Sequence, residues 1–342
     1  MKRHSKKLGA LILCSALALS LLAGCGGNAQ TPDTGDAPTG GDTSSESKKV
    51  VLVTPQKLGD KACVDLSWAG VQEGCEKYGW EPKVIEAEEG EYEDAMRAMA
   101  DEGYDLIIGL FSATQDAVIR VAPDYPDTKF FLINGEAEGD NIQCAQFWCN
   151  ESSFLCGVAA AMTTKTGKIA AIRGADVGDN IRFTAGFFHG ARTVNPDIEC
   201  VPMIAGSFED PTKGKELAML ALEQGCDIIM QICAKTSMGI REALVEAGKD
   251  KLYVGIDTDE SDNVPGQVLG TSATGYDTAI INAIGEVENG TFQTGILWHG
   301  LADGGVYMIE TDLCTPEVME AVKMYEEKII SGEIKVDATT NW

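Results

Sequence analysis

AMADEGYDLIIG, residues 98–109, is closely similar to LALEQGCDIIMQ, residues 220–231. Each stretch has the pattern of a helix end, a Gly, an acidic residue and then an apolar strand. The acidic residues, Asp105 and Asp227, are 122 residues apart, far more than the period of a solenoid repeat. The sequence therefore predicts two copies of one α/β lobe.

Strands and helices alternate on either side of these two stretches. VVLVT (50–54) and YDLIIGLF (104–111) are continuous apolar runs separated by helical patterns. The same alternation of strands and helices begins again at Asn150, with GKIAAIRG (167–174) and LYVGID (252–257) among its strands. Continuous apolar strands that alternate with helices are typical of a parallel sheet covered on both faces. We therefore predict that each lobe is a doubly wound parallel sheet.

The C-terminal part holds too few elements for a third domain. We expect a strand over 266–273, a helix over 276–289, two strands within 294–310 and a helix over 316–330. These pieces are predicted to complete the two lobes by crossing between them. The predicted N-terminal lobe comprises 49–148 and 274–294, and the predicted C-terminal lobe comprises 149–273 and 295–342. The predicted hinges lie near 148–150, 272–275 and 291–296.

The chain is strongly acidic. Its 342 residues include 53 Asp and Glu but only 27 Lys and Arg, which gives a net charge of −26. Such a surface repels phosphate backbones, so no nucleic-acid partner is expected. The apolar content of 44% is enough for a sizeable core.

The N-terminus has the pattern of an exported lipoprotein. After a basic start, the apolar run 8–24 is too short for a comfortable membrane span. It ends in LLAGC (21–25), which resembles the lipobox of bacterial lipoproteins, in which the Cys is diacylated and becomes the mature N-terminus. Residues 25–48 are rich in Gly, Ser, Thr, Pro and Asp and have the composition of a flexible tether. We predict a signal peptide over 1–24, lipid attachment at Cys25 and a place on the extracytoplasmic face of the cell membrane. The alternative is a generic signal peptide with a chance Cys.

The cysteines and histidines give poor support for a metal site. Without Cys14 and Cys25, nine cysteines remain, an odd number that cannot all pair. The chain has no C-x-x-C, and His189 and His299 are its only imidazoles beyond the leader. We therefore predict no metal and no cofactor, and we expect most cysteines to be small core residues.

The sequence contains no familiar catalytic motif. It lacks G-x-x-x-x-G-K-[ST], a G-x-G-x-x-G after a strand, G-x-S-x-G and H-E-x-x-H. We therefore predict that the protein is not an enzyme, and in particular not its own ATPase.

Several motifs occur in a fixed order along the chain. The firmest is NESSFLCGVAAAMTTKTGKIAAIRG (150–174), and it is followed by GSFEDPTKGKELA (206–218), VGIDTDES (254–261) and GLADGGVYM (300–308). With GDKACVDLSWAGV (59–71), they resemble the basic membrane protein family of lipoproteins, whose best-known type binds purine nucleosides. The resemblance implies a two-lobe type I periplasmic-binding-protein fold and a substrate-binding role in ABC import. The implied partners are a small-molecule ligand, an ABC permease and its ATPase, and the chain is expected to be a monomer.

The strand LYVGID delivers acidic residues at its C-terminal end. In open α/β sheets, ligands bind outside the carboxyl ends of the strands, and two facing lobes place both sets of ends on one cleft. Asp257 would enter that cleft, where a carboxylate can accept hydrogen bonds from two ribose hydroxyls. In the family the first acid of G-[VI]-D-x-D contacts the sugar, so the resemblance implies this role for Asp257. The alternative is an N-cap or loop carboxylate facing water, and we expect Asp259 and Glu260 to be solvated or capping residues.

The loop after the first strand departs from the family pattern. Family members place polar ligand contacts near Gly59-Asp60, so Asp60 is either a ligand contact or a helix cap. The family's S-F-N after this point is replaced by Ala62-Cys63-Val64. In the family this Phe stacks on the purine, and the Asn can hydrogen-bond. Their loss predicts weaker or different base selectivity.

Other aromatic residues are candidates for the stacking platform. Phe208 lies in GSFED, where relatives carry a Phe or Trp that faces the ligand. Phe111 and Ser112 follow a strand, and Trp148 lies at the first crossover. For each aromatic residue the alternative is a place in the core.

The cationic residues of the site also depart from the family. Lys235 lies at a strand end where relatives are Gly-rich, and it could receive an anionic ligand or pair with a surface acid. Relatives carry a Lys shortly before the position of Asp277, whereas TSATGYD (271–277) has none. The pocket is therefore expected to be altered on both lobes.

Together these features predict a lipid-anchored substrate-binding protein that delivers a small molecule, most simply a nucleoside, to an ABC importer. A sensor lipoprotein that presents its ligand to a membrane receptor kinase is the alternative. A surface adhesin is a third possibility.

Overall fold

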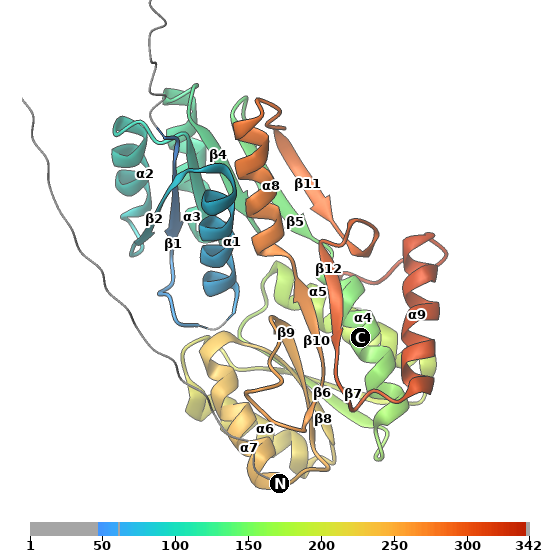
Figure 1. Ribbon diagram of the computed structural model, residues 1–342. Helices are drawn as coiled ribbons and strands as arrows, with labels where there is room; N and C mark the ends of the chain where they lie inside the picture. The colour runs from blue at the N-terminus through green and yellow to red at the C-terminus, as the bar shows by residue number, and fades with distance from the viewer. Residues whose placement is uncertain (1–46, 61, 340–342) are drawn as a thin grey trace, which may run out of the picture. The chain divides into compact units, whose positions relative to one another are not determined.

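The computed structural model describes residues 47–60 and 62–339, which belong to one compact unit, Glu46–Trp342. The predicted signal peptide, Cys25 and almost all of the predicted tether lie outside the described residues. The described part of the chain contains two six-stranded sheets with helices packed against them (Figure 1). None of its helices is both long and apolar enough to cross a membrane.

The first sheet is parallel throughout, with the order β11-β5-β4-β3-β1-β2. Its strands are β1 (Lys49–Thr54), β2 (Glu81–Glu86), β3 (Leu106–Leu110), β4 (Lys129–Ile133), β5 (Ile142–Phe147) and β11 (Gly295–His299). One face packs against α1 (Cys63–Tyr78) and α8 (Tyr276–Glu288), and the other against α2 (Tyr92–Asp101) and α3 (Phe111–Val121).

The second sheet has the order β12-β10-β9-β8-β6-β7 and is parallel except for the pair β10 and β12. Its strands are β6 (Lys168–Arg173), β7 (Glu199–Ile204), β8 (Ile228–Ile232), β9 (Leu252–Asp257), β10 (Val268–Thr274) and β12 (Val306–Glu310). Its helices are α4 (Cys149–Thr163), α5 (Gly178–Val194), α6 (Pro211–Glu223), α7 (Ser237–Ala247) and α9 (Pro316–Ile330).

The two sheets are copies of one arrangement. In chain order, β1 to β5 occupy the same places in the first sheet as β6 to β10 occupy in the second. The two repeated acidic residues, Asp105 and Asp227, also make the same kind of hydrogen bond. The Asp105 carboxylate accepts a hydrogen bond from the backbone N–H of Lys49 (2.8 Å), and that of Asp227 accepts one from Lys165 (2.7 Å). The predicted pair of doubly wound α/β lobes is confirmed.

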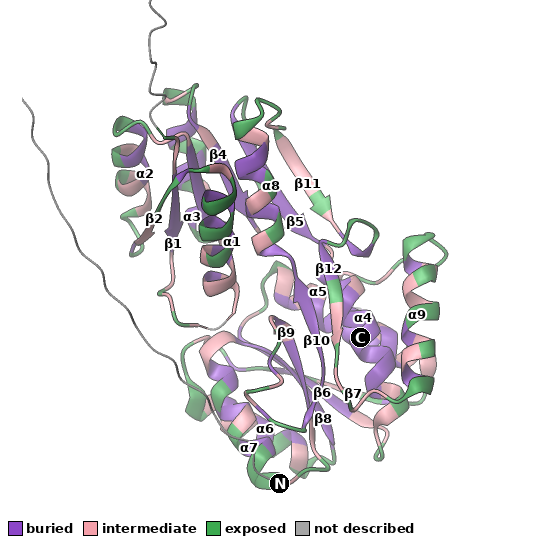
Figure 2. Cartoon of the chain, viewed as in Figure 1, coloured by how far each residue is buried: buried purple, intermediate pink, exposed green. Residues whose placement is uncertain are grey.

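Burial explains why the strands are so uniformly apolar. Every residue of β3 and β8 is buried, because helices cover both faces of each sheet. Figure 2 shows the central strands of both sheets as buried, whereas the edge strands β2, β7, β11 and β12 are partly exposed. The predicted core cysteines fit this arrangement: Cys75, Cys144, Cys149, Cys156, Cys226 and Cys233 are buried, and all nine described cysteines are free thiols.

The chain passes from one sheet to the other three times. It crosses at Trp148, after β5, and at Gly275, after β10, which are two of the three predicted positions. The third crossing was predicted near 291–296, with 295 onward in the C-terminal lobe. Instead β11 pairs with β5, with Gly295 beside Gln143, so the chain crosses only after His299. We therefore propose that the N-terminal lobe comprises 49–148 and 275–299.

Two helices of the second lobe pack unusually closely. A Cβ atom at Gly157 of α4 would lie 2.0 Å from the carbonyl oxygen of Phe187 of α5, and one at Gly186 of α5 would lie 2.0 Å from that of Asn150. Side chains at these positions would force the helices apart. The glycines therefore allow α4 and α5 to lie in close contact.

Candidate functional site

A cavity of about 540 Å³ is lined by both sheets. Asp60, Phe111 and Asn134, which follow strands of the first sheet, lie on one side of it. The second sheet contributes Gln231 and Asp257, at the ends of β8 and β9. The carboxyl ends of the two parallel sheets thus meet at one cavity, where open α/β sheets bind their ligands.

The backbone is strained around this cavity. Among the described non-glycine residues four have a positive φ: Phe111 (65°), Asn134 (53°), Ala234 (47°) and Asp257 (64°). All four line the cavity. Asn134 and Asp257 form an equivalent pair, because each lies at the carboxyl end of a strand, β4 or β9, that holds the same place in its sheet. Left-handed backbone is disfavoured for such residues and concentrates at functional sites.

Asp257 lies in the cavity wall, as the sequence predicted. Its side chain is buried, with 5% exposure, and its Oδ1 has no hydrogen-bond partner among the described residues. Burial raises the pKa of this carboxyl from 3.8 to about 7, and the carboxylates of Asp60, Asp179 and Glu260 add to the rise, whereas the Thr274 hydroxyl opposes it. A buried acceptor without a hydrogen-bond partner destabilises the folded protein, so we expect a ligand to donate a hydrogen bond to this atom.

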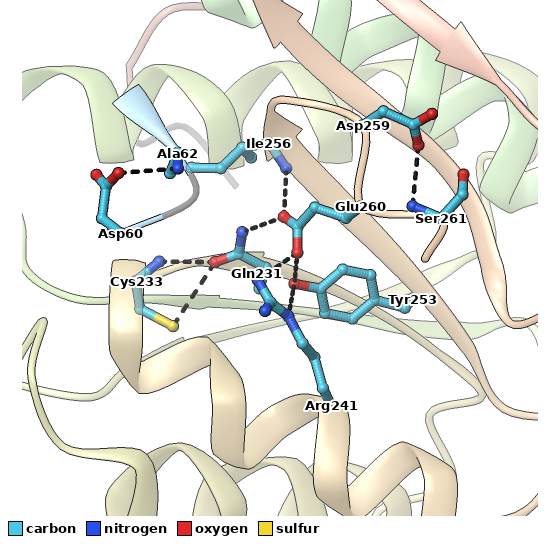
Figure 3. A network of polar contacts seen from close by, with 10 residues as sticks. All are labelled: Asp60, Ala62, Gln231, Cys233, Arg241, Tyr253, Ile256, Asp259, Glu260 and Ser261. Atoms are coloured by element: carbon cyan, nitrogen blue, oxygen red, sulfur yellow. Dashed lines mark hydrogen bonds and ion pairs between the residues drawn. The ribbon is translucent and has the colours of Figure 1, made fainter. Parts of the chain in front are cut away.

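Asp60 caps the start of α1, which was the alternative to a ligand contact for this residue. Its carboxylate accepts hydrogen bonds from the backbone N–H groups of Ala62 (2.9 Å), Val64 (3.1 Å) and Asp65 (3.1 Å), at the start of α1. It also lines the cavity (Figure 3 shows its place beside the second sheet). Ligand contact at Asp60 remains a prediction.

Glu260 was expected to be a solvated or capping residue, and it is buried instead. Its side chain is 3% exposed and lies among β8, β9 and α7 (Figure 3). The carboxylate accepts hydrogen bonds from Gln231 Nε2 (2.8 Å) and the Tyr253 hydroxyl (2.7 Å), and it forms an ion pair with Arg241. These partners replace water, which is why the acid can be buried. Asp259 is exposed, as predicted.

A second acid–base pair lines the cavity on the first turn of α5. Asp179 Oδ1 and Arg182 Nη1 are 2.5 Å apart. Burial raises the pKa of Asp179, and the neighbouring guanidinium opposes that rise. The Arg182 guanidinium also lies 5.0 Å from the ring centroid of Trp298 on β11, within cation–π range. Sequence patterns alone did not identify this pair.

Three of the predicted platform residues line the cavity: Phe111, Ser112 and Phe208. The Phe208 ring packs over Gly174, where a Cβ atom would lie 2.3 Å from it. A Gly at the end of β6 therefore leaves room for this ring. A stacking role for the aromatic residues remains a prediction.

Trp148 and Lys235, by contrast, are not among the residues that line the cavity. Trp148 stacks on Trp298, with ring centroids 3.9 Å apart and an interplanar angle of 19°. Lys235 Nζ lies 3.0 Å from Glu209 Oε2 in a surface ion pair. Lys235 therefore pairs with a surface acid, which was its alternative, whereas Trp148 is half-buried against an exposed Trp298 and is not a core residue.

The altered loop of the first lobe brings a thiol to the cavity. Cys63 lines it, whereas Val64 is fully buried in the core. Cys63 Sγ lies 3.7 Å from Asp60 Oδ2, and burial, together with the charges of Asp257 and Asp60, raises its pKa well above the ordinary value. Cys63 is therefore a neutral thiol and a weak donor.

Asn134 and Tyr276 are cavity residues that the sequence analysis did not identify. Asn134 Nδ2 donates a hydrogen bond to the Tyr276 hydroxyl (3.1 Å). The signal for Asn134 was its place directly after the strand TKFFLI, equivalent to the place of Asp257 in the second half. Across the described part of the chain, no group of three or more His, Cys, Asp or Glu is arranged to hold a metal ion.

Comparisons with known proteins agree with this architecture. Residues 47–340 match the family model described as ABC transporter substrate-binding protein PnrA-like. The ABC transporter nucleoside-binding protein BmpA of Lactococcus lactis subsp. cremoris (strain MG1363) is 29% identical over 95% of this chain and 98% of its own length. A CD4+ T-cell-stimulating antigen of Listeria innocua is 27% identical over 97% and 98%. A solute-binding protein of an ABC transporter system from Aeropyrum pernix K1 has a TM-score of 0.77 and 25% identity, with 86% of this chain and 94% of that chain covered.

Proposed function

Because the chain belongs to the family of PnrA-like ABC transporter substrate-binding proteins, we propose that its substrate is a nucleoside, bound in the cavity between the two sheets. Membership of this family makes the chain a binding component of a transporter, not an enzyme. The single observation that carries the nucleoside proposal is Asp257, a buried carboxylate with an unpartnered oxygen in the cavity wall. A carboxylate accepts hydrogen bonds only, and vicinal ribose hydroxyls supply two donors to it.

The rest of the cavity suits the remainder of such a molecule. Phe111, Phe208 and Tyr276 present aromatic rings, and a cavity of about 540 Å³ lies within the usual range for small-molecule sites. The two guanidinium groups, Arg182 and Arg241, already pair with Asp179 and Glu260. Among the residues that the structure describes, the cavity therefore keeps no unpaired arginine for a phosphate, which favours a nucleoside over a nucleotide. The name of the Lactococcus relative is in keeping with this substrate class.

Base selectivity is expected to differ from that of purine-nucleoside binders. The residue at the position of the family's stacking Phe is Cys63, and a thiol offers little surface to a base. Phe208, on the other lobe, then becomes the main candidate for stacking, because its ring lies at the cavity and is supported by Gly174.

Ligand binding is expected to draw the two lobes together. The lining residues come from both sheets, so one ligand satisfies both sides only when they approach. Titration calorimetry against a panel of nucleosides and free sugars, followed by small-angle scattering with the tightest ligand, tests this. We expect a nucleoside to bind and the radius of gyration to fall. If only sugars or none of the panel binds, the nucleoside proposal is wrong; tight binding without compaction contradicts closure.

The mature protein is proposed to begin at a lipid-modified Cys25. LLAGC and the tether-like stretch after it support this, and such an anchor would hold the binding unit beside its permease. Metabolic labelling with a fatty acid in the native host should label the wild-type protein and leave Cys25→Ala unlabelled. The control is Cys14→Ala, within the predicted signal peptide, which should label normally. Label that persists on Cys25→Ala would refute the anchor.

A further inference from the structure

Two buried oxygen atoms in the cavity wall have no partner. Among the buried side-chain N and O atoms that lack a hydrogen bond within the described residues, only Asn134 Oδ1 and Asp257 Oδ1 belong to residues that line the cavity. Asn134 comes from the first sheet and Asp257 from the second. Both atoms are acceptors, and a buried acceptor is stabilised only when a donor reaches it.

The orientation of the Asn134 amide is set by Tyr276. Asn134 Nδ2 donates to the Tyr276 hydroxyl (3.1 Å), which leaves Oδ1 as the free end of the amide. Tyr276 is itself held firmly, since it is 4% exposed and its ring meets Phe147 edge-on at 5.0 Å. It lies in the first turn of α8, directly after the crossover at Gly275.

Asn134 and Asp257 occupy equivalent places in the two lobes. Asn134 follows β4 and Asp257 ends β9, and these strands hold the same position in their sheets. Both residues have left-handed backbone, with φ of 53° and 64°. Asn and Asp tolerate this conformation better than most side chains do. Each lobe thus brings one short polar side chain to the cavity from the same structural point.

We propose that Asn134 is a ligand-binding residue, positioned by Tyr276, and that the ligand donates hydrogen bonds to both lobes at once. This rests on the proposed nucleoside function and narrows it. With Asp257 taking the ribose hydroxyls, Asn134 Oδ1 accepts a hydrogen bond from an N–H group of the base. The preferred ligand is therefore a nucleoside whose base carries a donor, such as an exocyclic amine or a ring N–H.

Matched nucleoside pairs test the donor requirement by calorimetry. The pairs are adenosine with purine riboside, inosine with 1-methylinosine and uridine with 3-methyluridine, in which the second member lacks a base donor. For the pair that the wild type binds, we expect removal of the donor to weaken binding about two- to twelvefold, as a neutral hydrogen bond of about 0.5–1.5 kcal/mol implies. Asn134→Gly should bind both members of that pair with similar affinity.

The variants are chosen to leave the backbone at position 134 unstrained. Gly adopts a φ of 53° freely, so Asn134→Gly removes the amide without a conformational cost. Asn134→Asp keeps an acceptor of the same shape and should restore the preference for the donor-bearing member. If Asn134→Gly discriminates between the members as strongly as the wild type does, the proposal is overturned. If no probe binds the wild type, the proposed nucleoside function itself fails, which is a different result.

Tyr276→Phe tests the positioning role. Loss of the phenol hydroxyl frees the amide to rotate, so discrimination between the members of a pair should fall. The same change in the Asn134→Gly background should have no further effect on discrimination. Tyr125→Phe is the control, because the Tyr125 hydroxyl bonds Asp101 (2.7 Å) on the surface and should leave discrimination unchanged. If Tyr276→Phe lowers affinity equally for both members, Tyr276 is structural and its assigned role is refuted.

Discussion

Replacing Asp257 by Asn should stabilise the ligand-free protein while it weakens ligand binding. The pKa of Asp257 in the folded protein is about 7, against an ordinary value of 3.8, chiefly because of burial. One unit of pKa difference corresponds to about 1.36 kcal/mol, so the buried charge lowers the free energy of unfolding by up to about 4 kcal/mol at pH 8. Asn keeps the shape, tolerates the φ of 64° and carries no charge. Denaturant unfolding at pH 8 measures the gain.

The pH dependence of that gain has a definite sign. The folded-state pKa lies above the unfolded one, so the folded protein holds the proton of Asp257 more tightly than the unfolded chain does. The contribution of this proton to the free energy of unfolding is therefore complete below about pH 4 and is lost as the pH rises to about 7. The difference in unfolding free energy between Asp257→Asn and wild type should grow over this window and level off above it. A difference that does not change with pH would contradict the buried-charge account.

The same substitution should reduce affinity for the tightest nucleoside about tenfold to a hundredfold. A hydrogen bond to a charged acceptor contributes about 1.5–3 kcal/mol, and 1.4 kcal/mol is a factor of ten. A 2′-deoxy analogue should bind the wild type more weakly than its parent, and this loss should be much smaller in the variant. Asp259→Asn is the matched control, because Asp259 lies two residues away, is exposed and does not line the cavity. If Asp257→Asn leaves the tightest ligand unaffected, the ribose role of Asp257 is wrong.

The lobes could be predicted from the sequence because their signals are local. Asp105, just before β3, and Asp227, just before β8, each accept a hydrogen bond from a backbone N–H group of the same lobe. A fully buried strand appears in the sequence as a continuous apolar run. β11 lacks such a signal. Its residues are only partly buried at the edge of the sheet, and its place depends on pairing with β5, about 150 residues earlier in the chain. The third crossing was therefore placed too early.

The site was predicted only where a single residue carries the signal. Asp257 could be identified because an acid directly follows an apolar strand. Glu260 was missed because its burial depends on Arg241, 19 residues away, and on Tyr253, neither of which differs in pattern from ordinary helix and strand residues. Asn134 and Tyr276 are 142 residues apart and meet only after the crossover brings α8 onto the first sheet. Such pairings come from tertiary structure and leave no mark on the sequence alone.

Arg241→Met should be the most destabilising of the cavity substitutions, at about 3–5 kcal/mol. It removes the cation from Glu260, whose side chain is 3% exposed, and leaves a buried carboxylate with only neutral partners, Gln231 and Tyr253. Denaturant unfolding of the variant and the wild type measures the loss.

A double variant and a surface pair separate the buried charge from lost packing. Adding Glu260→Gln to Arg241→Met should recover part of the stability, since no uncompensated charge then remains. Lys215→Met is the matched control: Lys215 pairs with Glu242 (2.7 Å) and Glu246 (2.9 Å), but both acids are largely exposed, so its loss should cost less than about 1 kcal/mol. If Arg241→Met costs no more than Lys215→Met, or if Glu260→Gln recovers none of the loss, the buried-charge account of Glu260 is wrong.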